Sequence, residues 1–351
     1  MSAAASLGPA AAAPLVSVAI PAYNAQHTIA QTLESVLAQT HAPLDIVVVD
    51  DGSTDGTWDV LQRYRQQVRL IRQDNAGIGA ARNASVQAAR GDFIALLDAD
   101  DLCRPERIAV QLRFLQTHPD VLLCSSDFAA FDASGPLAPS YCGEYYQRCS
   151  AARGGVRARY PHAGRFALLP DEAARHAGRN EVAVYWGAVY DELIQGNFIH
   201  PPTVMFRREA LQRAGAFDPQ IRIICEWEWF VRVARAGPVA FLDLPLLDYR
   251  RSPTQISSTP HSALDALAVA KAIYARDTPP GKGLSRQALR HLGALSLGAA
   301  DMLAELQPEL ALSLLAGSVF AYHTVKGQTW RTLFKIAMPA AVLDLLRRVR
   351  S

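Results

Sequence analysis

Acidic residues follow two of the apolar runs in this chain, at the points where strands would end. Asp50 and Asp51 come directly after the run 44–49, and Asp98 and Asp100 follow the run 93–97. Open parallel sheets bind ligands outside the carboxyl ends of their strands. A Mg²⁺ or Mn²⁺ ion that bridges a diphosphate takes one or two carboxylates and leaves its other positions to water and phosphate. Aspartate is also a common turn residue, but two such clusters on successive strand ends favour a binding site.

A glycine-containing segment lies between the two acidic clusters. Residues 77–82 read G-I-G-A-A-R, so Arg82 stands where a dinucleotide fingerprint would have its third glycine. The preceding strand pattern is also poor, and NAD binding is therefore not favoured. An arginine that enters a helix near an anionic ligand suits contact with phosphate. The alternative for Arg82 is an ion pair on the protein surface.

The elements that would position these residues form an alternating pattern over the first 125 residues. Strands are expected at 15–20, 44–49, 68–71 and 93–97, and helices at 26–39, from Thr57, at 79–89 and after Pro105. Strands separated by helices of this length indicate parallel βαβ units, and hence an α/β fold with a mostly parallel sheet flanked by helices.

The second half of the chain is less regular. Residues 131–195 keep no clean period, which predicts an insertion at the functional edge of the sheet, with short helices around Glu172 and Val189. A strand at 203–206 and helices at 208–214 and 226–236 follow. Trp227, Phe230, Val231 and Ala234 share one helical face and are expected in the core rather than as sugar-stacking platforms. Beyond Ser262 the pattern is all-helical.

The amino-acid composition limits the classes of function and the cellular compartment that fit this chain. The 351 residues carry 35 Lys and Arg against 33 Asp and Glu, a balance that is unusual for a nucleic-acid binder. Five cysteines without a C-x-x-C pair indicate neither a zinc site nor a disulfide framework, and fit a reducing cytosol. Residues 1–14 are Ala-rich, lack the basic start of a secretory signal and are expected to form a disordered tail. No uninterrupted apolar run reaches the ~20 residues of a membrane span.

Four motifs occur in an order that resembles the family 2 glycosyltransferases, which have the GT-A fold. They are V-S-V-A-I-P-A-Y-N at 16–24, V-V-D-D-G-S-T-D-G-T at 48–57, N-A-G at 75–77 with A-R-N at 81–83, and the D-x-D segment L-D-A-D-D at 97–101. The resemblance is strong over about 16–119 and moderate over 197–257. Each motif is weak alone, but the set in this order is specific.

The resemblance implies a role for each matching residue. Pro21, Tyr23 and Asp51 would line the nucleotide pocket, with Asp51 accepting a hydrogen bond from the base edge. Arg82 would lie on the nucleotide side. Asp98 would contact ribose or metal, and Asp100 would coordinate the cation on the diphosphate.

Two further positions near the diphosphate are implied in the same way. Ala99 lies inside the D-x-D segment and would contact the donor. Tyr249-Arg250 is similar to the family's Y-R ending, in which the basic side chain closes over the diphosphate.

A candidate base comes from the second half. Residues 225–232, C-E-W-E-W-F-V-R, resemble the family's E-D-x-x-x-W-x-R segment, but Cys225 replaces the first acid and Glu226 stands at the usual Asp position. Glu226 would remove the proton from the acceptor hydroxyl, with Glu228 as the reserve candidate. Without the resemblance, a solvated acidic pair at a helix start would explain both residues. His200 falls in a segment similar to the family's acceptor-facing loop, where it could bind a sugar or phosphate.

The C-terminal end has a separate signal. After Pro339, Val342, Leu345, Leu346 and Val349 recur at helical spacing beside Arg347, Arg348 and Arg350. A basic amphipathic helix of this kind can lie on an anionic membrane surface. Packing against the chain's own helices is the alternative.

The sequence therefore predicts a tail (1–14), a GT-A glycosyltransferase domain (15–260) and a helical C-terminal region (261–351). The enzyme is expected in the cytoplasm, with peripheral contact to the inner face of the membrane. It would move a sugar, with inversion and with Mg²⁺ or Mn²⁺, from a UDP-, GDP- or dTDP-sugar to a saccharide or lipid-linked acceptor in bacterial cell-surface polysaccharide or glycolipid assembly. A nucleotidyltransferase is disfavoured because 21–24 is not a glycine- and lysine-rich phosphate loop. A non-catalytic nucleotide- or carbohydrate-binding protein with a degenerate GT-A fold remains the main rival.

Overall fold

The computed structural model describes residues 13–146, 155–221, 223–252 and 260–337. Its first part alternates strands and helices as expected: β1 (Val16–Ala22), α1 (Ile29–Leu37), β2 (Leu44–Asp51), α2 (Thr57–Gln62), β3 (Arg69–Gln73), α3 (Ile78–Ala88), β4 (Phe93–Leu96), β5 (Leu102–Cys103) and α4 (Arg107–Thr117). Residues 1–12 of the expected tail and the expected helix after Pro339 lie outside the described residues.

The middle of the chain adds more strands than its sequence pattern indicated. It contains β6 (Leu123–Asp132), β7 (Gly135–Ala138), α5 (Cys142–Tyr145), η1 (Arg157–Arg159), β8 (His162–Ala167), α7 (Pro170–Arg175), β9 (Glu181–Gly187), α8 (Tyr190–Leu193), η2 (Pro201–Thr203), β10 (Met205–Arg207), α9 (Arg208–Ala214), α10 (Cys225–Ala236) and β11 (Val239–Arg250). The short helices α7 and α8 lie where they were predicted.

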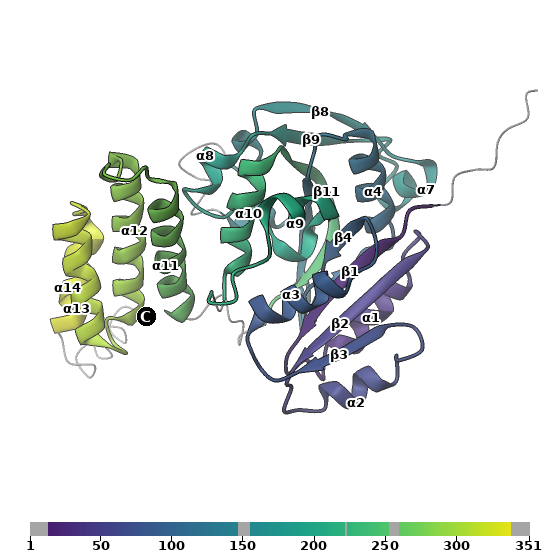
Figure 1. Cartoon of the computed structure of the whole chain (residues 1–351), viewed down its shortest axis with the longest axis horizontal. Helices are drawn as coiled ribbons and strands as arrows, with labels where there is room; N and C mark the ends of the chain where they lie inside the picture. Colours follow the sequence, from purple (N-terminus) through teal and green to yellow (C-terminus); the bar gives the residue numbers. More distant parts are fainter. Residues whose placement is uncertain (1–12, 147–154, 222, 253–259, 338–351) are drawn as a thin grey trace, which may run out of the picture.

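One mixed sheet joins these strands in the order β3-β2-β1-β4-β10-β6-β11-β9-β8, with β5 paired to β11 and β7 to β6 (Figure 1). Strands β3, β2, β1 and β4 are mutually parallel, as are β6 and β11, while β10 runs antiparallel between β4 and β6. The parallel strands β2, β1 and β4 end at one edge. The acidic residues that follow β2 and β4 therefore come to the same side of the molecule.

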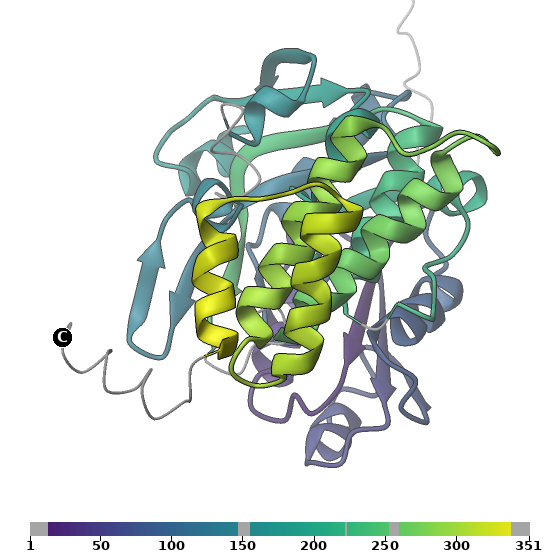
Figure 2. The same ribbon diagram turned by 90° about the vertical axis from the view of Figure 1, so that its left-hand side faces the viewer.

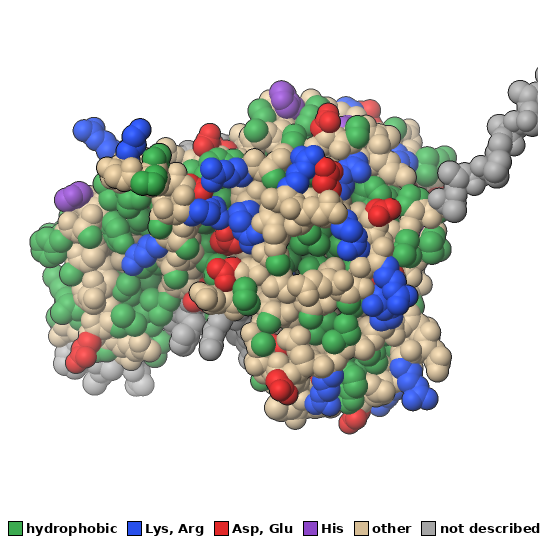
Figure 3. Space-filling view, viewed as in Figure 1, with side chains coloured by type: hydrophobic (Ala, Val, Ile, Leu, Met, Phe, Trp, Pro, Cys, Tyr) green, Lys and Arg blue, Asp and Glu red, His purple; other side chains and the backbone are tan. Residues whose placement is uncertain are grey.

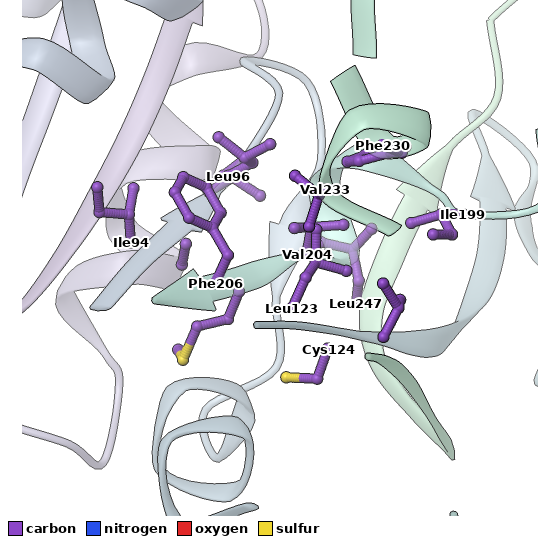
Figure 4. Packing of buried hydrophobic residues seen from close by; sticks show 14 of the residues in the cluster. Ile94, Leu96, Leu123, Cys124, Ile199, Val204, Phe206, Phe230, Val233 and Leu247 are labelled. Carbon is purple, nitrogen blue, oxygen red and sulfur yellow. The ribbon is translucent and has the colours of Figure 1, made fainter. Parts of the chain in front are cut away.

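The core lies on both faces of these strands, which is why their sequences are almost wholly apolar. Val18 in β1, Val48 in β2 and Ile94 in β4 are fully buried. Figure 4 shows how Leu96 and Phe206 on β4 and β10 pack beside the residues of the neighbouring strands and of α10. The predicted inner face of α10 is confirmed, since its apolar residues are 5% exposed or less: Trp227, Phe230, Val231 and Ala234.

The predicted insertion is largely a sheet extension. Strands β8 and β9 form an antiparallel hairpin that adds to β11 at the end of the sheet opposite β3. Four of the six residues of β8 are exposed, so this edge strand lacks the alternation that reveals a half-buried strand. Buried contacts hold the hairpin region to α4, where Arg113 bonds Glu172 and His176 lies 2.7 Å from Glu106.

After β11 the described chain is helical, as predicted. It forms α11 (Pro260–Asp277), α12 (Arg286–Leu303), α13 (Pro308–Ala316), the short π-helical segment η4 (Gly317–Ala321) and α14 (Gly327–Ala337). Figure 1 shows these helices side by side at one end of the molecule, and Figure 2 views them face on. Among the described residues, none of the helices combines the length and the apolar character needed to cross a bilayer.

Candidate active site

The loops after β1 and β2 are tied together at the carboxyl edge of the sheet. The Asn24 amide donates to Ser53 Oγ at 2.9 Å, and the Thr54 amide donates to Asn24 Oδ1 at 2.9 Å. Pro21 is buried within β1, whereas Tyr23 is 48% exposed at the rim of these loops. The contacts that the resemblance implies between these two residues and a nucleotide stay predictions.

Asp51 shapes the next loop. Its carboxylate accepts hydrogen bonds from Gln73 Nε2 at 2.7 Å, the Ala76 amide at 3.0 Å and the Gly77 amide at 2.9 Å. Gly77 has φ 90°, a conformation that favours glycine. Asp51 is 3% exposed, so its carboxylate fixes the β3–α3 loop in the structure. Its predicted role toward a nucleobase is untested.

The D-x-D turn is anchored through its backbone. The Ala99 carbonyl accepts from the hydroxyls of Thr28 and Thr32, both at 3.0 Å, which binds the turn to the start of α1. Arg250 lies against the other side, because its Nε donates to the Asp100 carbonyl at 2.9 Å and its amide donates to Asp101 Oδ1 at 2.9 Å. The structure thus brings Arg250, the last residue of β11, beside Asp100, while its predicted contact with the diphosphate stays a prediction.

Arg82 joins the two halves of the site. Its Nη2 donates to Asp98 Oδ1 at 2.9 Å, and its Nη1 donates to Glu226 Oε2 at 2.7 Å. The Arg82 side chain is only 2% exposed, so it does not form the surface ion pair that the sequence left open, and its contact with phosphate stays a prediction. A buried arginine that bridges two carboxylates places the end of β4 and the start of α10 in one cluster.

The two candidate bases on α10 face different surroundings. Glu226 points to Arg82 and the D-x-D turn, whereas Glu228 bonds Arg232, one turn further along α10, at 2.7 Å and Arg276 of α11 at 2.6 Å. Glu228 therefore holds α11 to α10, and of the two glutamates only Glu226 lies in the site.

The cluster is rich in buried acid. Burial and the adjacent Asp98 raise the pKa of Asp100 from 3.8 to about 6. Burial also raises the pKa of Glu226, although Arg82 opposes the shift. The pKa of Asp101 is raised by burial as well, and the Oδ2 atom of this residue has no hydrogen-bond partner. The Asp98–Asp100 pair fits a divalent cation, whose charge would relieve this repulsion. No group of three His, Cys, Asp or Glu suited to a metal occurs in the described part of the chain, so phosphate or water would complete the coordination.

His200 lies in an aromatic group that sequence reasoning missed. Its ring stacks on Phe128 at 4.1 Å between ring centroids and meets the edges of Tyr145 and Tyr249 at 5.0 and 4.8 Å. Burial, with Arg82 and Arg107 nearby, lowers the pKa of His200 to about 3, so the ring is neutral. These aromatic residues come from β6, α5 and β11, which are far apart in sequence, so no local motif could have grouped them.

A separate hollow of about 410 Å³ lies against the β8–β9 hairpin. Its lining includes Arg165, Arg179, Glu181 and Asp243 and none of the predicted site residues. The acids that follow β4 and the glutamate at the start of α10 gather instead around Arg82 at the strand ends.

Residues 17–166 match the sequence model described as glycosyl transferase family 2. The UDP-Glc:alpha-D-GlcNAc-diphosphoundecaprenol beta-1,3-glucosyltransferase WfaP of Escherichia coli is similar to this chain. It is 39% identical over 105 residues, which are 29% of this chain and 42% of that protein. The chain spans about two fifths of the length of the first curated relatives it matches.

Two solved structures share the architecture. S. aureus TarS 1–349 in complex with UDP-GlcNAc has a TM-score of 0.53 at 16% identity, over 86% of this chain and 88% of that one. The mannosyltransferase PcManGT from Pyrobaculum calidifontis, in complex with GDP-Man and Mn²⁺, has a TM-score of 0.53 at 19% identity, over 95% and 81%. At these identities the likeness shows the fold alone, and it confirms the predicted GT-A type α/β fold.

Proposed function

We propose that this chain, whose residues 17–166 match the sequence model of glycosyl transferase family 2, transfers a sugar from a nucleotide-sugar donor to a hydroxyl acceptor, with inversion at the anomeric carbon. One observation carries the proposal: Arg82 links Asp98 of the D-x-D turn to Glu226 at 2.9 and 2.7 Å. Asp98, which is expected to bind the donor, and Glu226, which is expected to activate the acceptor, thus pair with the same arginine side chain.

Glu226 would act as the general base. Its carboxylate would take the proton of the acceptor hydroxyl as that oxygen attacks the anomeric carbon. Burial raises the pKa of Glu226, which makes it a stronger base than an exposed glutamate. A single displacement on the face opposite the leaving diphosphate gives inversion.

Asp100 and Asp98 would hold the metal, Mg²⁺ or Mn²⁺. When bound, such an ion neutralises negative charge on the departing diphosphate. The chain's own contribution at this end is to orient the pair: Thr28 and Thr32 fix the Ala99 carbonyl, and Arg250 fixes that of Asp100. Arg250 also adds positive charge beside the diphosphate position.

The donor and acceptor classes are suggested by the similar proteins. WfaP is named for UDP-Glc and for an acceptor on diphosphoundecaprenol, and PcManGT was solved with GDP-Man. We therefore propose a UDP-, GDP- or dTDP-sugar as donor and a saccharide or lipid-linked acceptor, in the assembly of a bacterial cell-surface polysaccharide or glycolipid. The reaction would take place in the cytoplasm, at the inner membrane face when the acceptor is lipid-linked.

The alternative is a nucleotide- or carbohydrate-binding protein that does not catalyse transfer. The observation in its favour is the Arg82–Glu226 pair itself, because a carboxylate held by arginine is a weaker base than a free one. Cys225, at the position of the first acid, lies within 3.7 Å of both partners and adds no second carboxylate.

The test is release of nucleoside diphosphate from UDP-, GDP- and dTDP-sugars with saccharide and lipid-linked acceptors. We expect transfer from one donor class, a loss of about 10²–10⁴-fold in Glu226→Gln, and retained turnover in Glu228→Gln. Equal turnover in Glu226→Gln and the wild type would remove Glu226 as the base. Nucleotide binding without transfer to any acceptor would favour the non-catalytic alternative.

A further inference from the structure

An apolar surface covers the outer side of the C-terminal helices. Most exposed large hydrophobic side chains of the described chain lie between Met302 and Phe334, although this stretch is a small part of the sequence. Figure 3 shows hydrophobic side chains gathered at the end of the molecule formed by these helices. Exposed apolar patches of this kind mark contact sites in folded proteins.

Helix α14 is turned with its apolar side outward. Trp330, Leu333 and Phe334 are spaced for one helical face, and they are 68%, 38% and 46% exposed. The buried positions of the same helix are polar, since Thr329 is 6% and Thr332 0% exposed. An amphipathic helix that packs on its own core has the reverse arrangement.

Specific polar bonds hold α14 in this orientation. Asp301 of α12 accepts from Thr332 Oγ1 at 2.9 Å and Arg331 Nη2 at 3.0 Å, and Lys335 Nζ lies 3.0 Å from the same carboxylate. Three side chains of α14 thus converge on one acid. The outward position of Trp330 and Phe334 is therefore fixed by the fold.

Basic side chains flank the exposed side of α14. We define the α14 face as Trp330, Leu333 and Phe334, all at least 38% exposed. Lys326 and Arg331 are exposed beside it, and Arg331 shares the carboxylate of Asp301 with Lys335. Two exposed acids nearby, Glu305 and Glu309, lie before and at the start of α13.

We propose that the α14 face docks on an anionic lipid bilayer, with Trp330 and Phe334 inserted at the level of the head groups. Aromatic residues flanked by Lys and Arg suit this interface, because the basic side chains are attracted to anionic head groups. A second copy of the chain fits less well, because a two-fold contact would bring two basic rims together. The proposal rests on the proposed function in one respect: it would hold the enzyme where a lipid-linked acceptor lies.

Vesicle flotation of the full chain tests this surface. We expect it to float with vesicles rich in phosphatidylglycerol, less with phosphatidylcholine alone, and less at high salt. Trp330→Ser combined with Phe334→Ser should reduce binding at least about tenfold, since both rings lose their apolar contact with the bilayer. The matched control is Leu137→Ser with Leu169→Ser, two residues 42% and 52% exposed on the α/β part, which should float like the wild type.

Quenching by brominated lipids gives an independent readout. Trp330 fluorescence should be quenched in vesicles, and Trp330→Phe should lose that quenching while Trp227 and Trp229, buried in α10, report an intact fold. Three results would each overturn the proposal. The two double variants could float equally, the wild-type chain could fail to float, or the chain could form a concentration-dependent dimer that only the α14 variants lose. Flotation needs no nucleotide, so a failure of sugar transfer to soluble acceptors would leave this result standing and would count only against the proposed function.

Discussion

At the scale of single residues, the site is a balance between buried acids and one buried arginine. Arg82 is 2% exposed and holds Asp98 and Glu226, while Asp100 and Asp101 lie in the same turn with pKa values raised by burial. Without the guanidinium, the Glu226 carboxylate would be an unpaired buried charge, which is costly, whereas the Asp98 side chain is 30% exposed. The chemistry proposed for the site uses the same groups.

Replacing Arg82 by methionine should destabilise the fold by about 3–5 kcal/mol at neutral pH, because it leaves the buried Glu226 carboxylate without its partner. Urea unfolding measures the change, and the loss should shrink in acid as Glu226, whose pKa is raised by burial, takes up a proton. Arg213→Met is the control, since Arg213 pairs with Glu209 where both side chains are almost half exposed; it should cost no more than about 0.5 kcal/mol. Similar losses in both variants would contradict the buried bridge.

Asp100→Asn should stabilise the metal-free protein above pH 6. The folded-state pKa of Asp100 is raised from 3.8 to about 6, so the stability contributed by its protonated form is complete below pH 3.8 and is lost as pH rises through 6. The Asp100→Asn variant does not lose this stability, so above pH 6 its free energy of unfolding should exceed that of the wild type by about 1–3 kcal/mol. Thermal unfolding with EDTA at pH 4 and pH 8 gives the comparison, and a gain of equal size at both values would argue against this origin.

At the scale of elements, loops after successive strands lock one another at the carboxyl edge. Gly52 has φ 71°, and a Cβ there would lie 2.7 Å from the Asn75 amide. The glycine of the D-D-G motif is thus explained by the close approach of the loop that Asp51 holds. Asp51 and Gly52 belong to one motif, yet their partner segment 73–77 comes from the next βα unit.

Gly52→Ala should cost at least about 2 kcal/mol and weaken nucleotide binding, because it adds both strain and a collision. Gly281→Ala is the matched control. Gly281 has φ 79° with open space around its Cβ position, so it should cost about 1 kcal/mol and leave binding unchanged. Chemical unfolding and nucleotide titration measure the two effects, and equal costs would show that crowding at Asn75 is unimportant.

Much of this edge could be predicted from sequence, because the βαβ pattern and the motif order locate Asp51, Asp98, Asp100 and Arg250. The partners of Arg82 could not. Glu226 lies 144 residues further along the chain, and only the packing of α3 against α10 brings the two together. The hairpin β8–β9 was missed for another reason, since the edge strand β8 exposes four of its six residues and shows little hydrophobic period.

At the scale of the whole molecule, the helical region is joined to the GT-A part through α10 and the end of α8. Arg276 of α11 donates to Glu228 Oε1 at 2.6 Å, and Tyr274 Oη donates to the Ile194 carbonyl at 3.2 Å. The same helix therefore presents Glu226 to the site on one side and Glu228 to α11 on the other. The division into domains at residues 260 and 261 stays a prediction.

Arg276→Ala should loosen this junction without changing the sheet. Glu228 keeps Arg232, so the loss of the half-exposed Arg276 should cost only about 0.5–2 kcal/mol. Hydrogen exchange should become faster in α11 and stay unchanged in β1, β2 and β4. Faster exchange throughout the sheet would mean that the two parts unfold as one unit.

The most direct test of the central claim is calorimetric titration with UDP, GDP and dTDP, each with and without Mn²⁺. The site around Asp98, Asp100 and Arg250 predicts metal-dependent binding of one nucleotide class, lost in Asp100→Ala and kept in Glu228→Gln. Absence of binding to any of the three nucleotides, with or without the metal, would contradict the assignment of this site to a nucleotide-sugar donor.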